Sequence, residues 1–219
     1  MGIIKGFRES SIPVIVALAV LLPANILSWV AFSTTSWAYV NNTMVNFQGY
    51  GLWRICATSG SCSLLDGTRS EWYAAFQACG VFGFMGINVA MLLVIMYMFV
   101  EWWEKDVELK VGAIASCFLA VASYISAVVV FSQEIRGWLA TSADLLLGFS
   151  LWLAVAAIIL TAIAGTLLAV DLILNILNIQ TVTISNSGNN STMTAASSNN
   201  SQGTSSKGKT KRRVTQGPV

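Results

Sequence analysis

Two cysteines separated by a short polar segment are the residues best suited to chemistry in this sequence. Cys56 and Cys62 flank Ala-Thr-Ser-Gly-Ser, and these small residues favour a turn. Segments 52–56 and 62–65 on either side are able to form β-strands. A hairpin there would bring the two cysteine Cα atoms to about the 5.5–6 Å that a disulfide needs. Because disulfides form in oxidising compartments, this segment should lie outside the cell or in the secretory lumen.

The sequence offers little for catalysis or for metal binding. It contains no histidine, so it lacks the commonest general base and the commonest metal ligand. Cys79 and Cys117 lie in apolar runs and are expected to pack as small buried hydrophobic residues. Cys56 and Cys62 alone, without histidine or further ligands, do not complete a zinc site. We therefore expect no catalytic residues, no metal site, no cofactor and no nucleic-acid partner.

The composition and its pattern along the chain predict a membrane protein. Of 219 residues, 55% are hydrophobic and 10% are charged, whereas soluble domains carry about 25% charged residues. A helix needs about 20 residues to cross a bilayer. Four uncharged runs meet this length, at 12–32, 72–100, 111–131 and 145–170. The lipid bilayer is therefore the first expected partner.

The first apolar run has an alternative interpretation as a cleavable signal peptide, because Lys5 and Arg8 precede it. The run is longer than the about 7–15 residues of a signal-peptide core, and three more runs follow it. These two observations favour a retained span. Pro13 in the first helical turn is compatible with a helix start, and Pro23 is expected to kink the helix.

The remaining segments complete the predicted fold, a mainly α four-helix transmembrane bundle with a small extracellular antiparallel sheet. The sheet is expected from the outer loop at 33–71, where glycines separate segments rich in aromatic and β-branched residues. A second outer loop is expected at 132–144. We assign 1–175 to this four-span domain. Segment 181–219, rich in Ser, Thr, Asn and Gly, is expected to form a disordered cytosolic tail.

The orientation in the membrane rests mainly on the predicted disulfide. Nine Lys and Arg residues fall on the side of the termini and three on the side of the loops. Five of the nine lie in the distant tail, and the positive-inside rule counts mainly residues close to the spans. Both arguments place the termini in the cytosol. Asn41 begins the sequon Asn-Asn-Thr, a glycosylation site compatible with an outside loop.

The loop motif resembles one superfamily of four-span proteins. Gly-Leu-Trp-x-x-Cys, followed by a second cysteine and placed between the first two spans, is similar to the claudin, peripheral myelin protein and epithelial membrane protein group. That group also contains transmembrane auxiliary subunits of glutamate receptors and calcium channels. The matching residues are Trp37, Gly51, Leu52, Trp53, Cys56 and Cys62.

The resemblance implies a plasma-membrane protein of cell–cell contacts that associates with itself in cis and in trans. Its function would be adhesion and paracellular barrier formation. The alternative is an auxiliary subunit that regulates gating or trafficking of a channel or receptor. The cysteine spacing is shorter than in claudins, and the arginine that claudins place early in the second span is missing, so the resemblance is to a divergent member. Val219 resembles the last residue of PDZ ligands, but Gly217 and Pro218 make a poor strand-addition peptide.

Several span residues have two interpretations. Gly80, Gly83 and Gly86 recur on one helix face, where small residues let helices approach closely. We favour packing inside the bundle over a lateral self-association face. Asn25 and Asn88 are polar residues within spans, and an interhelical hydrogen bond is the favoured role over a transport path.

The loop residues also leave alternatives open. Tyr39, Phe47 and Tyr50 either pack the sheet onto the helix ends or form an exposed recognition patch. The four charges of the first loop sum to zero, which predicts no strong ion preference if the loop lines a pore. A solvated surface is the favoured interpretation of these charges, which belong to Arg54, Asp66, Arg69 and Glu71.

Overall fold

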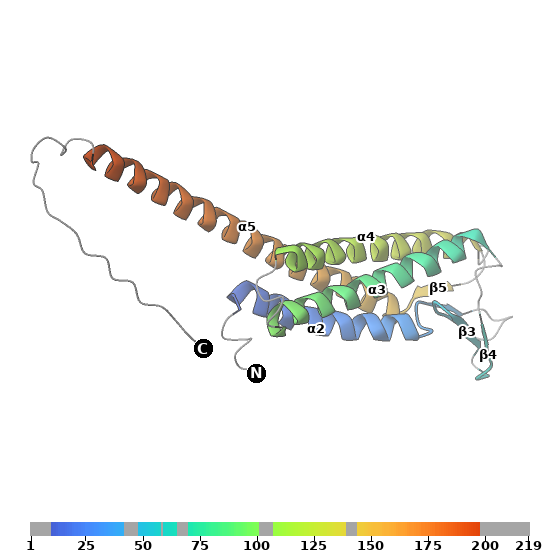
Figure 1. Cartoon of the computed structure of the whole chain (residues 1–219). Helices are drawn as coiled ribbons and strands as arrows, with labels where there is room; N and C mark the ends of the chain where they lie inside the picture. The colour runs from blue at the N-terminus through green and yellow to red at the C-terminus, as the bar shows by residue number, and fades with distance from the viewer. Residues whose placement is uncertain are drawn as a thin grey trace, which may run out of the picture. The chain divides into compact units, whose positions relative to one another are not determined.

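The structure, a computed structural model, describes residues 10–41, 48–57, 59–64, 70–100, 107–138 and 144–197 (Figure 1). Side chains are described throughout these ranges except at positions 40, 41, 48, 138, 144 and 178–197. In chain order the elements are α2 (Ile12–Ser33), β1 (Ala38–Asn41), β2 (Gln48–Tyr50), β3 (Arg54–Ala57), β4 (Cys62–Leu64), α3 (Glu71–Phe99), α4 (Val107–Trp138), β5 (Asp144–Leu147) and α5 (Phe149–Ser197).

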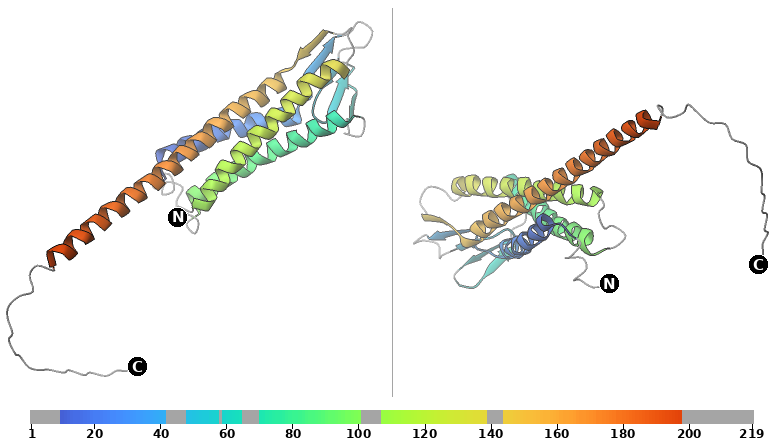
Figure 2. Two further views of the ribbon diagram at one scale, coloured as in Figure 1. Left: turned by 90° about the horizontal axis from the view of Figure 1, so that it is seen from above. Right: turned by 90° about the vertical axis from the view of Figure 1, so that its left-hand side faces the viewer.

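Four helices among the described residues are long and apolar enough to cross a membrane. The shortest of them has 22 residues, which at about 1.5 Å per residue is longer than the about 30 Å hydrocarbon core of a bilayer. The helices run alongside one another, and the sheet lies at one end of the bundle (Figure 2). The protein is therefore an integral membrane protein with four spans, and the predicted fold class is confirmed.

The helix interior is built from small and aliphatic side chains at helical spacing. In α2 the buried positions include Val14, Ala17 and Leu21, which recur every three or four residues and therefore face one side. Residues on the opposite face, such as Leu22 and Ile26, are exposed and are positioned to contact lipid. Asn25 lies within the span and donates from its Nδ2 to Asn88 Oδ1 on α3 at 3.0 Å, the interhelical hydrogen bond that was predicted.

The sheet has five antiparallel strands in the order β4-β3-β2-β1-β5. Strands β1 to β4 come from the first loop, as expected, but β5 comes from the segment before α5. The prediction that 145–147 begin the fourth span was wrong, since these residues pair with β1. An apolar run of this length does not distinguish a strand from a helix end. The alternation is visible only in the fold, where Leu146 is exposed and its neighbours are half-buried.

Helix α4 is longer than its apolar run at both ends. It ends at Trp138, so the first half of the predicted loop at 132–144 is helical. The extension is stabilised because Ile135, four residues after the buried Phe131, also packs into the core at the sheet end. At its other end α4 begins at Val107, so Lys110, which directly precedes the apolar run at 111–131, lies inside the helix.

Helix α5 continues as helical backbone to Ser197, beyond position 181, where the disordered tail was predicted to begin. Extending an existing helix costs less free energy than nucleating a new one, so a polar sequence can follow a membrane span as helix. The bundle and the sheet belong to one unit, Met1–Asn175, and a second unit spans Ile176–Val219. Residues 198–219, with Val219, lie outside the described residues, and their disorder and PDZ contact stay predictions.

Two glycines of α3 let α4 approach closely. A Cβ added at Gly86 would lie 2.8 Å from the Cβ of Ala120 and 3.1 Å from its Cα. One added at Gly83 would overlap the buried ring of Tyr124. These contacts support packing inside the bundle over a lateral self-association face. Gly80 differs, because its neighbour is Leu52 of the sheet region.

Gly86→Ala is expected to destabilise the protein, even though alanine is the better helix former. The added methyl group would press on the backbone of α4, and overpacking of this kind typically costs about 1–3 kcal/mol. The midpoint of thermal unfolding of the full chain in detergent should fall. Gly112→Ala is the matched control, since its Cβ would lie 3.5 Å from Leu93 Cδ1, an ordinary contact. An equal midpoint for the two variants would contradict the close approach of α3 and α4.

Candidate functional site

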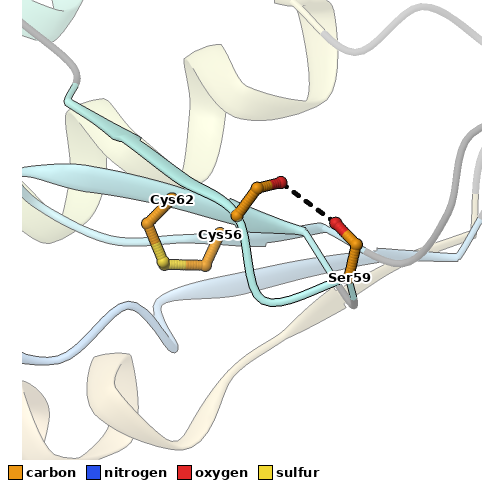
Figure 3. The surroundings of a disulfide bond; sticks show 4 residues. Cys56, Ser59 and Cys62 are labelled. Atoms are coloured by element: carbon orange, nitrogen blue, oxygen red, sulfur yellow. Dashed lines mark hydrogen bonds between the residues drawn. A yellow bond between two sulfur atoms is a disulfide. The ribbon is translucent and has the colours of Figure 1, made fainter.

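The disulfide joins β3 to β4 within a hairpin (Figure 3). Cys56 and Cys62 are directly opposite in the register, and their Cα atoms are 4.1 Å apart, closer than the predicted spacing. The next pair is hydrogen-bonded, because the backbone N–H of Ala57 donates to the carbonyl of Ser61 at 2.9 Å. The cysteines therefore occupy a non-hydrogen-bonded position, where opposed Cα atoms lie closer together, at about 4.5 Å.

The hairpin turn is short and exposed. Gly60 has φ +83°, a left-handed conformation that favours glycine, and its N–H donates to the carbonyl of Ala57 at 3.0 Å. The hydroxyls of Ser59 and Ser61 hydrogen-bond to each other at 3.0 Å, as the dashed line in Figure 3 marks. All three residues of β4 are exposed. Because β4 is an edge strand that buries little surface, the disulfide is one of the main contacts that hold it to β3.

The Gly-Leu-Trp motif forms the turn between β2 and β3. This turn packs closely against the backbone that follows α2. A Cβ added at Gly51 would lie 2.6 Å from Thr35 Cα and 2.7 Å from the carbonyl oxygen of Thr34. No larger residue fits there without moving backbone. Trp53 is half-buried, and its ring meets Phe32 edge-on, with 5.4 Å between ring centroids.

Leu52, the middle residue of the motif, fixes the turn to α3. Its side chain is buried and contacts the position of Gly80. Its carbonyl accepts a hydrogen bond from Gln77 Nε2 at 2.9 Å. The hydroxyl of Tyr73 donates to the carbonyl of Gly51. The motif therefore connects the sheet to two helices through buried contacts.

Trp37 is the second anchor of the sheet. It is fully buried, and its indole Nε1 donates to the carbonyl of Ala31 at 2.8 Å. Its ring meets Phe76 and Phe131 edge-on at centroid distances of 5.1 and 5.6 Å. Its carbonyl accepts from the N–H of Gly148 at 2.8 Å. This tryptophan thus ties β1 to three helices and to the segment that follows β5.

Of the three loop aromatics, Tyr50 follows the packing interpretation, and the choice stays open for Tyr39 and Phe47. Tyr50 is buried, and this burial raises its pKa, so it packs the sheet onto the helices. Tyr39 is half-buried, and Phe47 lies outside the described residues. Asn41 ends β1, but its side chain and the rest of the sequon are outside the described part, so its glycosylation stays a prediction. Of the four first-loop charges, Arg54 and Glu71 are exposed, and Asp66 and Arg69 lie outside the described residues.

At the other end of the bundle lies an ion pair that sequence reasoning missed. Lys110 Nζ on α4 pairs with Asp171 Oδ2 on α5, and both side chains are buried, with exposures of 4% and 5%. The amine also lies 4.8 Å from the ring centroid of Tyr97, and Asn175 Nδ2 donates to Asp171 Oδ2 at 3.3 Å. A signal was present, because the two charges directly flank the apolar runs at 111–131 and 145–170.

The contacts of Trp37, Gly51, Leu52 and Trp53 place these motif residues between the sheet and the helices. The sheet presents β4 and β5 as its outermost strands. In comparisons with known proteins, no protein-family model matches the chain, and no curated protein matches it.

Proposed function

We propose that the protein is a divergent member of the claudin, peripheral myelin protein and epithelial membrane protein group. In this proposal it mediates adhesion between cells and forms a paracellular barrier. The sheet lies outside the plasma membrane and the termini lie in the cytosol, because the disulfide requires an oxidising compartment. The protein concentrates at cell–cell contacts and associates with itself in cis and in trans.

The observation that carries the proposal is the rigid mounting of the sheet on the bundle. Trp37 and Leu52 are buried between sheet and helices, and the two residues belong to the motif that carries the resemblance. A sheet held in this way projects its edges and loop tips at a fixed orientation. Edge strands are natural templates for pairing with another chain, and β4 and β5 are the two edges of this sheet.

A regulatory subunit of a channel or receptor is the second candidate function. The observation that favours it is the short connection between α4 and β5, which consists of residues 139–143. With α4 helical to Trp138, little chain is left in the second loop to reach an opposing membrane. In this alternative the same sheet docks on a partner in its own membrane.

A cell-mixing experiment distinguishes the two functions. Two populations of non-adherent cells express the full chain with different fluorescent tags, and we expect enrichment at contacts between the two colours. Contacts with non-expressing cells provide the control and should show no enrichment. An even distribution of protein that has reached the surface normally would reject adhesion in trans. The auxiliary-subunit function would then be tested by identifying a channel or receptor that co-purifies with the protein.

A further inference from the structure

A groove of about 360 Å³ lies where the end of α2 meets the sheet. Pockets for small ligands span about 300–1,000 Å³, so the groove lies at the lower end of this range, with room for a lipid headgroup but not for a whole lipid. It combines one cation, three hydroxyl residues and two large apolar side chains. Its lining residues are Ser33, Thr34, Thr35, Trp53, Arg54 and Leu64.

The position of the groove along α2 fixes its depth in the membrane. Ser33 is the last residue of the span. One turn earlier, Trp29 is 52% exposed and Val30 is 36% exposed, so this face of the helix contacts lipid. Exposed tryptophans favour the membrane interface. The groove therefore opens at the level of the phospholipid headgroups, in the leaflet on the sheet side.

The chemistry of the lining matches a lipid headgroup attached to an acyl chain. Arg54 is exposed, and a guanidinium binds phosphate oxygens with paired, charge-assisted hydrogen bonds. The hydroxyl of Ser33 donates to the carbonyl of Trp29 at 2.8 Å, so its remaining lone pairs can accept from a headgroup hydroxyl but do not bind the phosphate. Leu64 is 77% exposed, which is unfavourable in water but not against hydrocarbon.

We propose that this groove binds a phospholipid of the sheet-side leaflet. Arg54 pairs with the phosphodiester, and Leu64 and Trp53 contact the glycerol and the upper part of an acyl chain. The chain then continues along the exposed face of α2 past Trp29. The site does not depend on the adhesion or regulatory function proposed above, because it follows from the depth of the groove and its charge.

Native mass spectrometry of the full chain, released from detergent after addition of phosphatidylglycerol or phosphatidylcholine, tests the proposal. We expect one retained lipid at equal protein and lipid concentrations. Arg54→Gln should lower its apparent affinity roughly tenfold, as expected for loss of one charge-assisted contact, and Leu64→Ser should lower it less. Arg136→Gln is the matched control, since Arg136 is an exposed arginine in the last turn of α4, at the sheet end of the bundle.

Three results would overturn the proposal. One is equal lipid retention by Arg54→Gln and Arg136→Gln, with unchanged thermal unfolding of both variants. Another is complete displacement of the lipid by glycerophosphocholine or inorganic phosphate, which would make a soluble phosphate compound the ligand. A third is unchanged lipid retention by Arg54→Gln together with lost enrichment in the cell-mixing experiment, which would assign the groove to a protein contact.

Discussion

Lys110→Met is expected to destabilise the bundle by about 3–5 kcal/mol, because it leaves the carboxylate of Asp171 buried without its cation. The carboxylate would keep one described polar contact, the 3.3 Å hydrogen bond from Asn175 Nδ2. The surrounding residues at this end of the bundle are apolar, including Met98, Ala113 and Leu168. The midpoint of thermal unfolding of the purified full chain in detergent should fall well below that of the wild type.

Two further variants separate loss of the pair from loss of packing. Lys110→Met combined with Asp171→Leu removes both charges and should recover most of the stability, since apolar side chains often replace a buried ion pair without cost. Glu108→Gln is the matched control, because Glu108 is an exposed charge in the first turn of the same helix. A melting midpoint of Lys110→Met equal to that of Glu108→Gln would show that the pair carries no stability.

The spans could be predicted from the sequence because charged residues mark where an apolar run must leave the membrane. The same reasoning does not give the helix ends. The apolar run at 111–131 reflects the thickness of the hydrocarbon core. Helix α4 extends beyond it, from Val107 to Trp138, and two residues outside the run, Lys110 and Ile135, are buried against other parts of the protein. β5 could not be predicted for a related reason. The run at 145–170 contains residues of both a strand and a helix, and both are apolar.

The site was partly predictable from the sequence. Contacts between residues close in the chain could be predicted, and contacts between distant residues could not. The Cys56–Cys62 hairpin is local, so spacing and turn residues were sufficient to predict it. The Lys110–Asp171 pair joins positions 61 residues apart, and the groove collects residues from the end of α2 and from β3 and β4. Such sets form only when the helices and the sheet are placed relative to one another. The function of Gly51 also depends on placement, because Thr34 and Thr35 are what exclude a side chain there.

Cys56→Ser and Cys62→Ser should each destabilise the sheet and reduce delivery to the cell surface. Loss of a native disulfide typically costs about 2–5 kcal/mol. β4 has only three residues, all exposed, so few other contacts hold it against β3. Quality control retains proteins with an unfolded domain. Surface biotinylation relative to total protein, together with thermal unfolding in detergent, measures the two effects.

Two controls test whether the effect comes from a reactive free thiol or from the loss of any cysteine. The double variant should match the single variants, which would show that the effect is loss of the bond and not a reactive thiol. Cys79→Ser alters a half-buried free cysteine of α3 and should be delivered normally. Normal surface levels and unchanged unfolding in both single variants would reject the structural role of the bond.

The size of the effect indicates how far the disulfide acts beyond its own hairpin. The cysteines are six positions apart, and the chain-entropy contribution of closing so short a loop is about 2 kcal/mol. A loss of this size would confine the bond to the β3–β4 edge, with the rest of the sheet still held by Trp37 and Leu52. A clearly larger loss would mean that the edge strand supports the buried motif turn, so that the anchor and the hairpin unfold together.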